Sequence, residues 1–253
     1  MQEICPICGS CDIVIQNAVD KRFKCRSCDS VFVLKESTPA PAPLAPATKS
    51  ALSPKEIYNR NINSILETTC NFGDIDSSGT AFCVSKKGFF VTNAHVLIGD
   101  VQGKKTLADS VYVCKSRSTD FISAEIVYMD AQNDLALLKV NELTAFSPLS
   151  FSLKPAEVGD EIVVIGNSKG EGLVLLNGIV GDVARTYGRT HAFVFNALVT
   201  HGCSGAPVLN GAGEVCGVTV GGTNDAAGMN YAISLDALQS FLSSARAAKS
   251  VEL

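Results

Sequence analysis

The sequence predicts a mainly β protein with a small cysteine-rich module at its amino terminus and a helix near its carboxy end. Between residues 64 and 233, short apolar runs alternate with polar or glycine-containing turns, which is typical of β-strands. After Ser234 the apolar residues recur at helical spacing instead. The module is set apart because five of the ten cysteines lie within the first 28 residues.

Two pairs of cysteines in this module have the spacing of a metal site. Cys5 and Cys8 form one C-x₂-C pair, and sixteen residues later Cys25 and Cys28 form the second. Four thiolates in two such pairs can enclose Zn²⁺ in a tetrahedron, so we expect a structural zinc ion in a zinc ribbon. Cys11 is a spare thiol that we expect not to bind the metal. A redox role is the weaker interpretation, because no thioredoxin-like βαβ pattern surrounds either pair.

The charge of the predicted zinc ribbon, residues 1–36, bears on its partner. Basic side chains gather around Phe23, but acidic residues offset them and leave the module formally neutral. Nucleic-acid binding usually requires a net basic surface. Docking of a protein partner, or plain stabilisation, is therefore favoured over nucleic-acid binding. The whole chain, with a formal net charge of −4, offers no basic field either.

A proline-rich segment follows the module. Residues 37–54 contain five of the nine prolines, interleaved with alanine. Such a composition favours extended polyproline conformations and cannot build a core, so we expect a linker that spans on the order of 50 Å. Ser53, Pro54 and Glu56 then have the pattern of a helix start, with Ser53 as the cap, and we expect a short helix to about Asn61.

The rest of the chain, residues 55–253, is predicted to form two β-barrels and a closing helix. The first barrel, about 55–145, has expected strands around 65 and at 81–85, 89–92, 111–115, 124–129 and 135–140. The second barrel, about 156–234, has expected strands at 161–165, 173–183, 192–196, 207–210, 215–220 and 230–233. The helix, about 235–247, is expected to pack on the second barrel through Leu235, Leu238, Phe241, Leu242 and Ala245.

Composition also indicates a compartment. The amino terminus has no basic and apolar stretch of the signal-peptide kind, so secretion is not expected. The uncharged run 192–213 contains histidine, asparagine, proline and several glycines, and we interpret it as barrel rather than a membrane span. Buried thiols in a reducing cytoplasm explain the five cysteines outside the module. These are Cys70, Cys83, Cys114, Cys203 and Cys216.

Residues 202–207 place a serine between glycines in the pattern Gly-x-Ser-Gly-x-Pro. Such a turn suits a nucleophile. With Ser204 as the attacking group, the amides of Gly202 and Ser204 would point at the oxyanion that forms when its oxygen adds to a carbonyl. On the motif alone, a glycine-rich hairpin turn is an equally good interpretation.

A base and an acid upstream favour the catalytic interpretation. His95 follows the apolar run 89–91 and would leave the end of a strand to face a cleft, whereas Asp134 precedes a buried-strand pattern. Their order with Ser204 is that of chymotrypsin-type enzymes, and the separations of 39 and 70 residues leave room for a barrel on each side. We therefore expect peptide-bond hydrolysis through an acyl-enzyme, with no cofactor for catalysis.

The two other histidines are given no catalytic role. His191 has the context of an exposed strand position, and His201 is expected only to border the substrate cleft. His201 lacks the preceding strand and the carboxylate that make His95 a credible base.

Several further motifs occur in a fixed order along the chain. They are Ser-Gly-Thr-Ala-Phe at 78–82, Gly-Phe-Phe-Val-Thr-Asn-Ala-His-Val at 88–96, Asn-Asp-Leu-Ala-Leu-Leu-Lys at 133–139, Gly-Asn at 166–167, Gly-Ile-Val at 178–180 and the turn at 202–207. Together they resemble the trypsin-like serine proteases of the HtrA/Deg type, over roughly residues 55 to 240. The resemblance implies two six-stranded antiparallel barrels with the triad between them, protein or peptide substrates, and the capacity to form oligomers.

Three features depart from that family's pattern. Cys203 stands where the family usually has asparagine, Ala206 stands where it usually has glycine, and no PDZ domain follows. Neither substitution removes a catalytic group, so activity is still expected. A thiol beside the nucleophile could be a redox control point, but an inert small residue is the favoured interpretation of Cys203.

The resemblance also suggests a specificity pocket. It puts the floor of the pocket at Leu198, six residues before the nucleophile, and the walls at 217–221, which include Thr219 and Val220. An apolar floor favours small or medium apolar side chains before the scissile bond and argues against Arg or Lys.

The alternative from another functional class is a proteolytically silent adaptor. In that case the protease fold would present a peptide groove while the zinc ribbon docks a partner. The intact set of His95, Asp134 and Ser204 argues against it, and a loosely formed oxyanion hole would argue for it.

Overall fold

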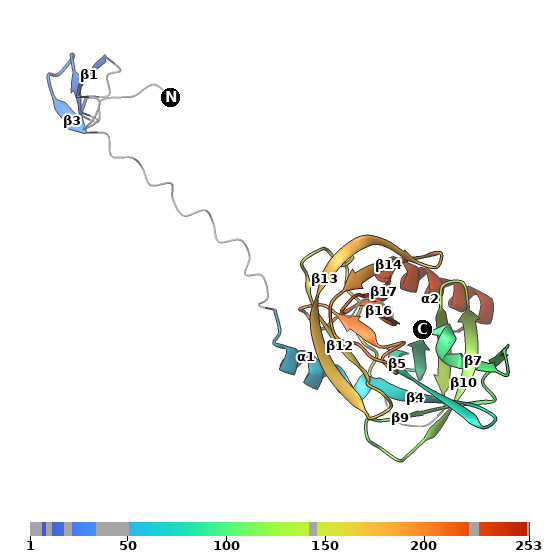
Figure 1. Ribbon diagram of the computed structural model, residues 1–253. Coiled ribbons are helices and arrows are strands. Elements are labelled where there is room, and N and C mark those ends of the chain that lie inside the picture. Colours follow the sequence, from blue (N-terminus) through green and yellow to red (C-terminus); the bar gives the residue numbers. More distant parts are fainter. Residues whose placement is uncertain are drawn as a thin grey trace. The chain divides into compact units, whose positions relative to one another are not determined.

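The protein is described here from a computed structural model, which covers residues 7–8, 12–17, 22–33, 51–141, 146–222, 228–251 and 253. The chain divides into two compact units, Met1–Ser50 and Ala51–Leu253 (Figure 1). Cys5, Cys11 and the predicted linker up to residue 50 lie outside the described residues.

The first unit contains a three-stranded antiparallel sheet. Its strands are β1 (Ile13–Asn17), β2 (Arg22–Cys25) and β3 (Val31–Val33), in that order across the sheet. Phe23 is buried and its ring stacks on Phe32 with centroids 6.1 Å apart. Among the described residues of this unit, only Phe23 and Cys25 are buried apolar side chains, which is far too little to stabilise a fold by burial alone.

The second unit begins with a capped helix, α1 (Pro54–Asn61), as the sequence predicted. The Ser53 hydroxyl accepts from the Glu56 amide, and the Glu56 carboxylate accepts from the Ser53 amide, which completes a capping box. Ile57 is buried in the main core of the unit. The Leu52 amide donates to the Gly211 carbonyl at 2.8 Å, so the helix is anchored to a turn of the second barrel.

Six strands close the first barrel, in the order β10-β11-β6-β5-β4-β9. Phe90 lies fully buried inside it and meets Phe146 edge-on, with ring centroids 4.9 Å apart. Leu66, Val113 and Leu138 complete this interior from three other strands. The strands are β4 (Ile65–Phe72), β5 (Ile75–Ser85), β6 (Phe89–Thr92), β9 (Ser110–Cys114), β10 (Ile122–Asp130) and β11 (Leu135–Val140).

Six more strands close the second barrel, in the order β12-β13-β14-β17-β16-β15. Its interior is filled by Ile162, Val164, Phe193, Phe195 and Val208. β13 is longer than the sequence predicted, because it continues past residue 183 to pair with β14 in a projecting hairpin. The strands are β12 (Glu161–Asn167), β13 (Leu173–Tyr187), β14 (Thr190–Phe195), β15 (Pro207–Leu209), β16 (Val215–Gly222) and β17 (Asn230–Ser234).

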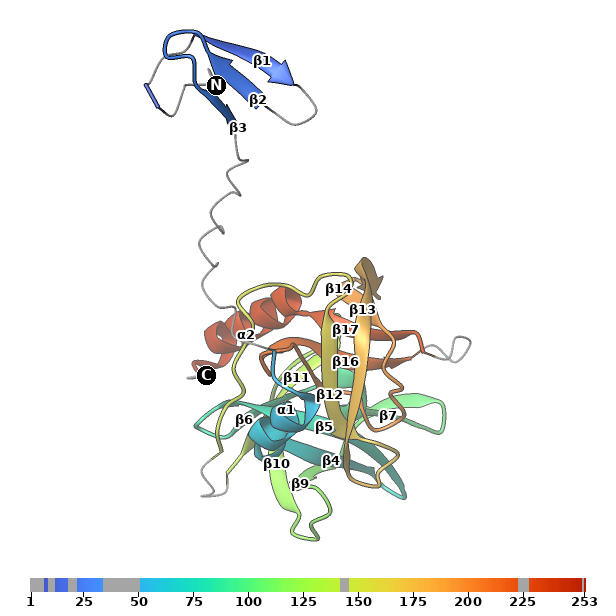
Figure 2. The ribbon, with the colours of Figure 1, turned by 90° about the vertical axis from the view of Figure 1, so that its left-hand side faces the viewer.

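A third apolar cluster joins the two barrels and the closing helix α2 (Leu235–Lys249), which is drawn in red in Figure 2. Leu137 of the first barrel and Val218 of the second both belong to this cluster. On α2, Phe241 packs against Tyr128 of β10 with ring centroids 5.5 Å apart. The helix therefore rests on both barrels, not only on the second as the sequence suggested, and it helps to hold them together.

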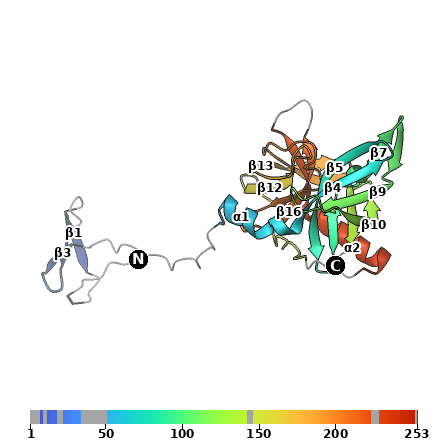
Figure 3. The same ribbon diagram turned by 90° about the horizontal axis from the view of Figure 1, so that it is seen from below.

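Two elements near the first barrel were not predicted. A hairpin of β7 (Ile98–Val101) and β8 (Lys104–Leu107) projects from its edge (Figure 3). Gln102 and Gly103 form its two-residue turn, and both have positive φ angles (53° and 81°). The 3₁₀ helix η2 (Ala94–Leu97) carries His95 directly after β6.

No helix in the described part of the chain is long and apolar enough to cross a membrane. The uncharged run 192–213 contains most of β14, the turn around Ser204 and β15, in agreement with its interpretation as barrel.

Candidate active site

The first barrel brings His95 and Asp134 together at its rim. His95 Nδ1 lies 2.7 Å from Asp134 Oδ2, and the His95 backbone amide donates to Asp134 Oδ1 at 2.9 Å. The His95 side chain is 44% exposed and that of Asp134 only 12%. The carboxylate is thus bonded through both oxygens to one residue, which holds the imidazole by Nδ1 and leaves Nε2 directed elsewhere.

Local backbone geometry places Asp134 in this position. Its φ of 53° lies in the left-handed region, which Asp and Asn adopt more readily than other side chains. The amide nitrogen of the buried Asn93 side chain donates to the Asp134 carbonyl at 2.8 Å and holds this conformation. The motif containing Asn93 had been noted in the sequence, but nothing local assigned this contact.

The second barrel also contacts this turn. Thr190 Oγ1, at the start of β14, donates to the Asn133 side-chain oxygen at 2.6 Å. Tyr187, at the end of β13, has its pKa raised by burial and by the negative charge of Asp134. The projecting β13–β14 hairpin of the second barrel therefore packs against the turn at Asn133 and Asp134 and supports it.

Ser204 lies in a turn that only glycine can form at two positions. Gly202 has a φ of 93° and Gly205 a φ of 83°. A Cβ on Gly202 would lie 2.2 Å from the Asn167 carbonyl oxygen, and one on Gly205 would lie 2.1 Å from the Thr80 carbonyl oxygen. Both positions are therefore restricted to glycine by conformation and by space.

Two backbone amides of this turn are available to donate hydrogen bonds to a ligand. Residues 199–206 are all described, and within them the amides of Cys203 and Gly205 donate to backbone carbonyls, whereas those of Gly202 and Ser204 have no acceptor in the described protein. The His201 carbonyl accepts from the Lys169 amide at 2.7 Å. Because the carbonyl and amide of a trans peptide point in opposite directions, this bond turns the Gly202 amide away from the Lys169 loop.

The Ser204 hydroxyl makes a different bond from the one expected of a nucleophile. It donates to the Val220 carbonyl of β16 at 2.8 Å, and within the described residues no hydrogen bond joins it to His95. Catalytic hydrogen bonds of unliganded enzymes often form only on substrate binding.

Leu198, the predicted floor of the specificity pocket, is 71% exposed in the structure. Its role in the specificity pocket stays a prediction. Its neighbours Ala197 and Val199 turn inward against the second barrel's interior cluster instead. An offset of six residues from the nucleophile does not determine which residue of a tight turn faces inward. Thr219 and Val220, the predicted walls, are buried on β16.

The two departures from the family pattern fit the core beneath the turn. Cys203 is fully buried and burial raises the pKa of its thiol, which favours the inert interpretation over a reactive thiolate. Ala206 is also fully buried and lies against Gly166, where an added Cβ would be 2.9 Å from that of Ala206. The missing side chain of Gly166 therefore makes room for the extra methyl group of Ala206.

The other histidines lie apart from this arrangement. His191 Nδ1 lies 3.0 Å from Asp236 Oδ2, and both side chains are largely exposed. His201 contributes its carbonyl to the turn through Lys169.

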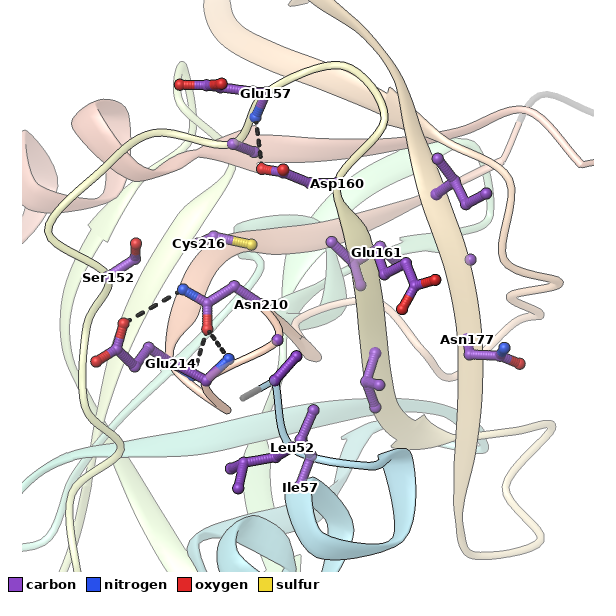
Figure 4. A pocket seen from close by; sticks show the side chains of 18 of the residues that line it. Leu52, Ile57, Ser152, Glu157, Asp160, Glu161, Asn177, Asn210, Glu214 and Cys216 are labelled. Atoms are coloured by element: carbon purple, nitrogen blue, oxygen red, sulfur yellow. Dashed lines mark hydrogen bonds between the residues drawn. The ribbon is translucent and has the colours of Figure 1, made fainter. Parts of the chain in front are cut away.

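A pocket of 960 Å³ on the second barrel does not coincide with these residues (Figure 4). Leu52 and Ile57 form one part of its wall, and Glu214 there holds Asn210 by a hydrogen bond of 3.2 Å. His95, Asp134 and Ser204 are absent from its lining. A sizeable pocket is a common first guess for an active site, but this pocket does not contain the candidate catalytic groups.

In the first unit, three of the four predicted metal ligands are brought together. The sulfur atoms of Cys8, Cys25 and Cys28 all lie within 4.8 Å of one another, and those of Cys8 and Cys25 are 3.6 Å apart. A disulfide would require about 2.05 Å. Tetrahedral thiolates at about 2.3 Å from zinc lie ~3.8 Å from each other, so the three sulfurs fit such an ion.

Comparison with known proteins agrees with this geometry. Residues 79–218 match the family described as "Trypsin-like peptidase domain". The chain belongs to this family. The serine endoprotease DegS of Haemophilus influenzae is 28% identical over 190 residues, which cover 71% of this chain and 53% of DegS. The chain spans about half the length of the DegS relatives that it matches.

Solved structures agree in fold. The active form of the Rv3671c protease from M. tuberculosis has a TM-score of 0.67 and 24% identity, covering 84% of this chain and 93% of that one. The HtrA-type protease AlgW with a tripeptide has a TM-score of 0.68 and 22% identity, covering 78% of this trypsin-like chain and 65% of AlgW.

Proposed function

We propose that this trypsin-like chain is a serine endopeptidase that cleaves protein substrates with Ser204, His95 and Asp134. The observation that carries the proposal is the two-point bond between Asp134 and His95, with Oδ2 2.7 Å from Nδ1 and Oδ1 2.9 Å from the backbone amide. That arrangement fixes one tautomer and one orientation of the imidazole, which is what a general base requires.

The reaction would proceed in two steps. Ser204 Oγ attacks the scissile carbonyl carbon while His95 Nε2 takes its proton, and Asp134 stabilises the resulting imidazolium. The oxyanion accepts hydrogen bonds from the amides of Gly202 and Ser204, which have no acceptor in the described protein. The imidazolium then protonates the leaving amine. Water, activated by His95, hydrolyses the acyl-enzyme and restores Ser204.

We also propose a preference for small or medium apolar side chains before the scissile bond. The wall formed by Thr219 and Val220 is buried and uncharged, and Val199 packs inward next to the exposed Leu198. Such a surface has no carboxylate to pair with Arg or Lys of a substrate. A peptide library with the residue before the cleaved bond varied tests this; a preference for Arg or Lys would contradict it.

Labelling by a fluorophosphonate probe tests the activity without a known substrate. The wild-type protein should be labelled, and Ser204→Ala and His95→Ala should not. Ser234→Ala is a matched control, because Ser234 also lies beside a histidine and an aspartate, and its hydroxyl donates to Asp236 and to the His191 carbonyl. Labelling should survive in this variant. A folded wild type that resists labelling would favour the silent adaptor instead.

We propose that the amino-terminal module binds one structural Zn²⁺ through Cys8, Cys25, Cys28 and Cys5, the last of which lies outside the described residues. The sulfur distances given above fit tetrahedral thiolate coordination. The small described core of the module supports a need for metal, since zinc contributes about 10 to 16 kcal/mol of apparent binding free energy in comparable peptides.

Metal analysis of the purified chain tests this second proposal. One zinc per chain is expected, and Cys25→Ser should reduce it to a small fraction. Cys216→Ser, a change of a buried thiol in the second barrel, should leave the zinc content unaltered. Equal metal content in the wild type and Cys25→Ser would contradict the assignment.

We further propose that the module docks a protein partner. Its formal neutrality over residues 1–36 supports this over nucleic-acid binding. Affinity for single-stranded DNA that is measurable at 50 mM salt and falls steeply by 200 mM would contradict the proposal.

A further inference from the structure

Thr80 forms an unusual set of contacts for a buried strand residue. It lies on β5 of the first barrel and is fully buried. Its amide donates to the Ser204 carbonyl at 2.8 Å and its hydroxyl donates to the Gly202 carbonyl at 2.8 Å. The hydroxyl and the backbone amide of this one residue therefore bond the two residues whose own amides are expected to face the oxyanion.

The Thr80 hydroxyl both donates and accepts a hydrogen bond. Besides donating to Gly202, it accepts from the Asn167 amide of β12 at 2.9 Å. The Thr80 carbonyl in turn accepts from the hydroxyl of Thr92 at 2.8 Å. The amide, the hydroxyl and the carbonyl of Thr80 all have hydrogen-bond partners, so the residue is held in one position. It can therefore restrain the conformation of the residues bonded to it.

The turn that contains Gly202 and Ser204 needs restraint by other residues. Gly202 is in a left-handed conformation with its amide unpaired, and glycine resists neither rotation nor peptide flipping by its own side chain. The Lys169 amide fixes the His201 carbonyl at 2.7 Å, and Thr80 fixes the next carbonyl, that of Gly202. Together these bonds set the planes of the peptides on both sides of Gly202.

Close packing allows the contact. A Cβ at Gly79 would lie 2.6 Å from a methyl carbon of Val96 and 3.4 Å from the Ser204 carbonyl oxygen. The absence of a side chain at Gly79 lets β5 approach the turn closely enough for Thr80 to bond it. The threonine side chain, which carries its hydroxyl on the β-carbon, fits the space between β5 and the turn.

We propose that Thr80 is a positioning residue that keeps the Gly202 and Ser204 amides in the orientation that binds the oxyanion. This inference rests on the proposed endopeptidase function. Thr80 acts through the turn and touches no substrate itself.

Three variants separate this role from simple stabilisation. Thr80→Val keeps the shape but removes the hydroxyl, and Thr80→Ser keeps the hydroxyl. Thr68→Val is the matched control, because Thr68 is fully buried on the neighbouring strand β4 and its hydroxyl has no partner among the described residues.

The readouts are the fluorophosphonate labelling rate, the fraction of molecules labelled at completion, and kcat and KM for a cleaved peptide. Loss of one oxyanion donor costs about 10²- to 10³-fold in kcat, so a misplaced pair should cost about 10- to 100-fold. We expect this loss in the labelling rate and kcat of Thr80→Val, with full labelling at completion and KM within about 3-fold. Thr80→Ser and Thr68→Val should stay within about 3-fold of wild type.

A merely structural role would lower the labelled fraction of Thr80→Val and leave the rate of the remaining molecules unchanged. That result, or equal losses in Thr80→Val and Thr68→Val, would overturn the inference. So would failure of Thr80→Ser to restore the rate.

Amide hydrogen exchange supplies a measurement that does not depend on activity. In Thr80→Val the amides of Cys203 and Gly205, which are bonded within and beside the turn, should exchange at least about 10-fold faster than in wild type. Unchanged exchange would overturn the inference even if the wild type were inactive. Faster exchange in an unlabelled protein would support the structural hold while refuting the proposed function alone.

Discussion

The two barrels differ in how their candidate catalytic groups are hydrogen-bonded. In the first, both oxygens of the Asp134 carboxylate are bonded to His95, so the base and its acid are already arranged. In the second, the Ser204 hydroxyl is bonded to Val220 and two amides of the turn lack an acceptor in the described protein. His95 and Asp134 are thus already joined, whereas no hydrogen bond joins the Ser204 hydroxyl to this pair within the described residues.

The two barrels are connected by a few hydrogen bonds and by a shared apolar cluster. Only two hydrogen bonds from Thr80, described above, link the first barrel directly to the Gly202 and Ser204 carbonyls in the described structure. The apolar cluster shared with α2 holds the barrels at the required separation. Apolar packing therefore sets the cleft, and a few polar contacts set the angles of the groups inside it.

The largest effect is expected from removing the reacting side chain of either barrel. His95→Ala and Ser204→Ala should each lower kcat by about 10⁵- to 10⁶-fold, and the double variant should lose little more, because the two residues act as one unit. Steady-state cleavage of a peptide identified from the library measures this. Additive losses would mean that the two barrels contribute independently.

The next effect concerns the hydrogen-bonded pair of His95 and Asp134. Asp134→Asn should lower kcat by about 10³- to 10⁴-fold, because the amide group favours the wrong tautomer of His95. Asp236→Asn is the matched control: it alters an exposed histidine–aspartate pair, that of His191, with atoms 3.0 Å apart. The control should retain full kcat. A comparable loss in both variants would show that the effect does not come from His95.

The alkaline limit of stability should depend on buried thiols in both barrels. Burial raises the pKa of Cys70 in the first barrel and of Cys216 in the second to about 12, from ordinary values near 9. Their stabilisation is complete below pH 9 and is lost as the pH rises from 9 towards 12, because only the unfolded chain ionises there. Each thiol should cost about 1.4 kcal/mol per pH unit in that range.

Thermal unfolding at pH 8 and pH 10 measures this loss. Cys70→Ala and Cys216→Ala should each reduce the difference in Tm between the two pH values by a similar amount, whatever their effect at pH 8. An unchanged difference would mean that these thiols do not control the alkaline limit.

The smallest effect is expected at Leu198. Because this side chain is 71% exposed, Leu198→Ala should change the free energy of unfolding by less than about 0.5 kcal/mol. It should also leave kcat/KM for peptides with Ala or Val before the cleaved bond within about 3-fold. A loss of 30-fold or more would place Leu198 in the specificity pocket.

Local patterns predicted much of this protein correctly. Apolar alternation located the barrel strands, the Ser53 and Glu56 pattern located the start of α1, and helical spacing located α2. These signals depend on neighbours within a few residues, so one sequence is enough to read them. The hairpin of β7 and β8 was missed because its strands have only four residues each and none of these residues is buried, which leaves no clear apolar alternation.

What the sequence determined by itself is the chemistry available: a histidine, an aspartate and a serine in a fixed order, and cysteine pairs at metal spacing. Tertiary structure alone decided that Leu198 faces solvent, that α2 rests on both barrels, and that Thr80 bonds Gly202, 122 positions away. The physical reason is that barrel closure brings distant strands together. The hydrogen bonds of buried groups are then satisfied by whichever neighbours the closed fold provides, and no local pattern encodes that choice.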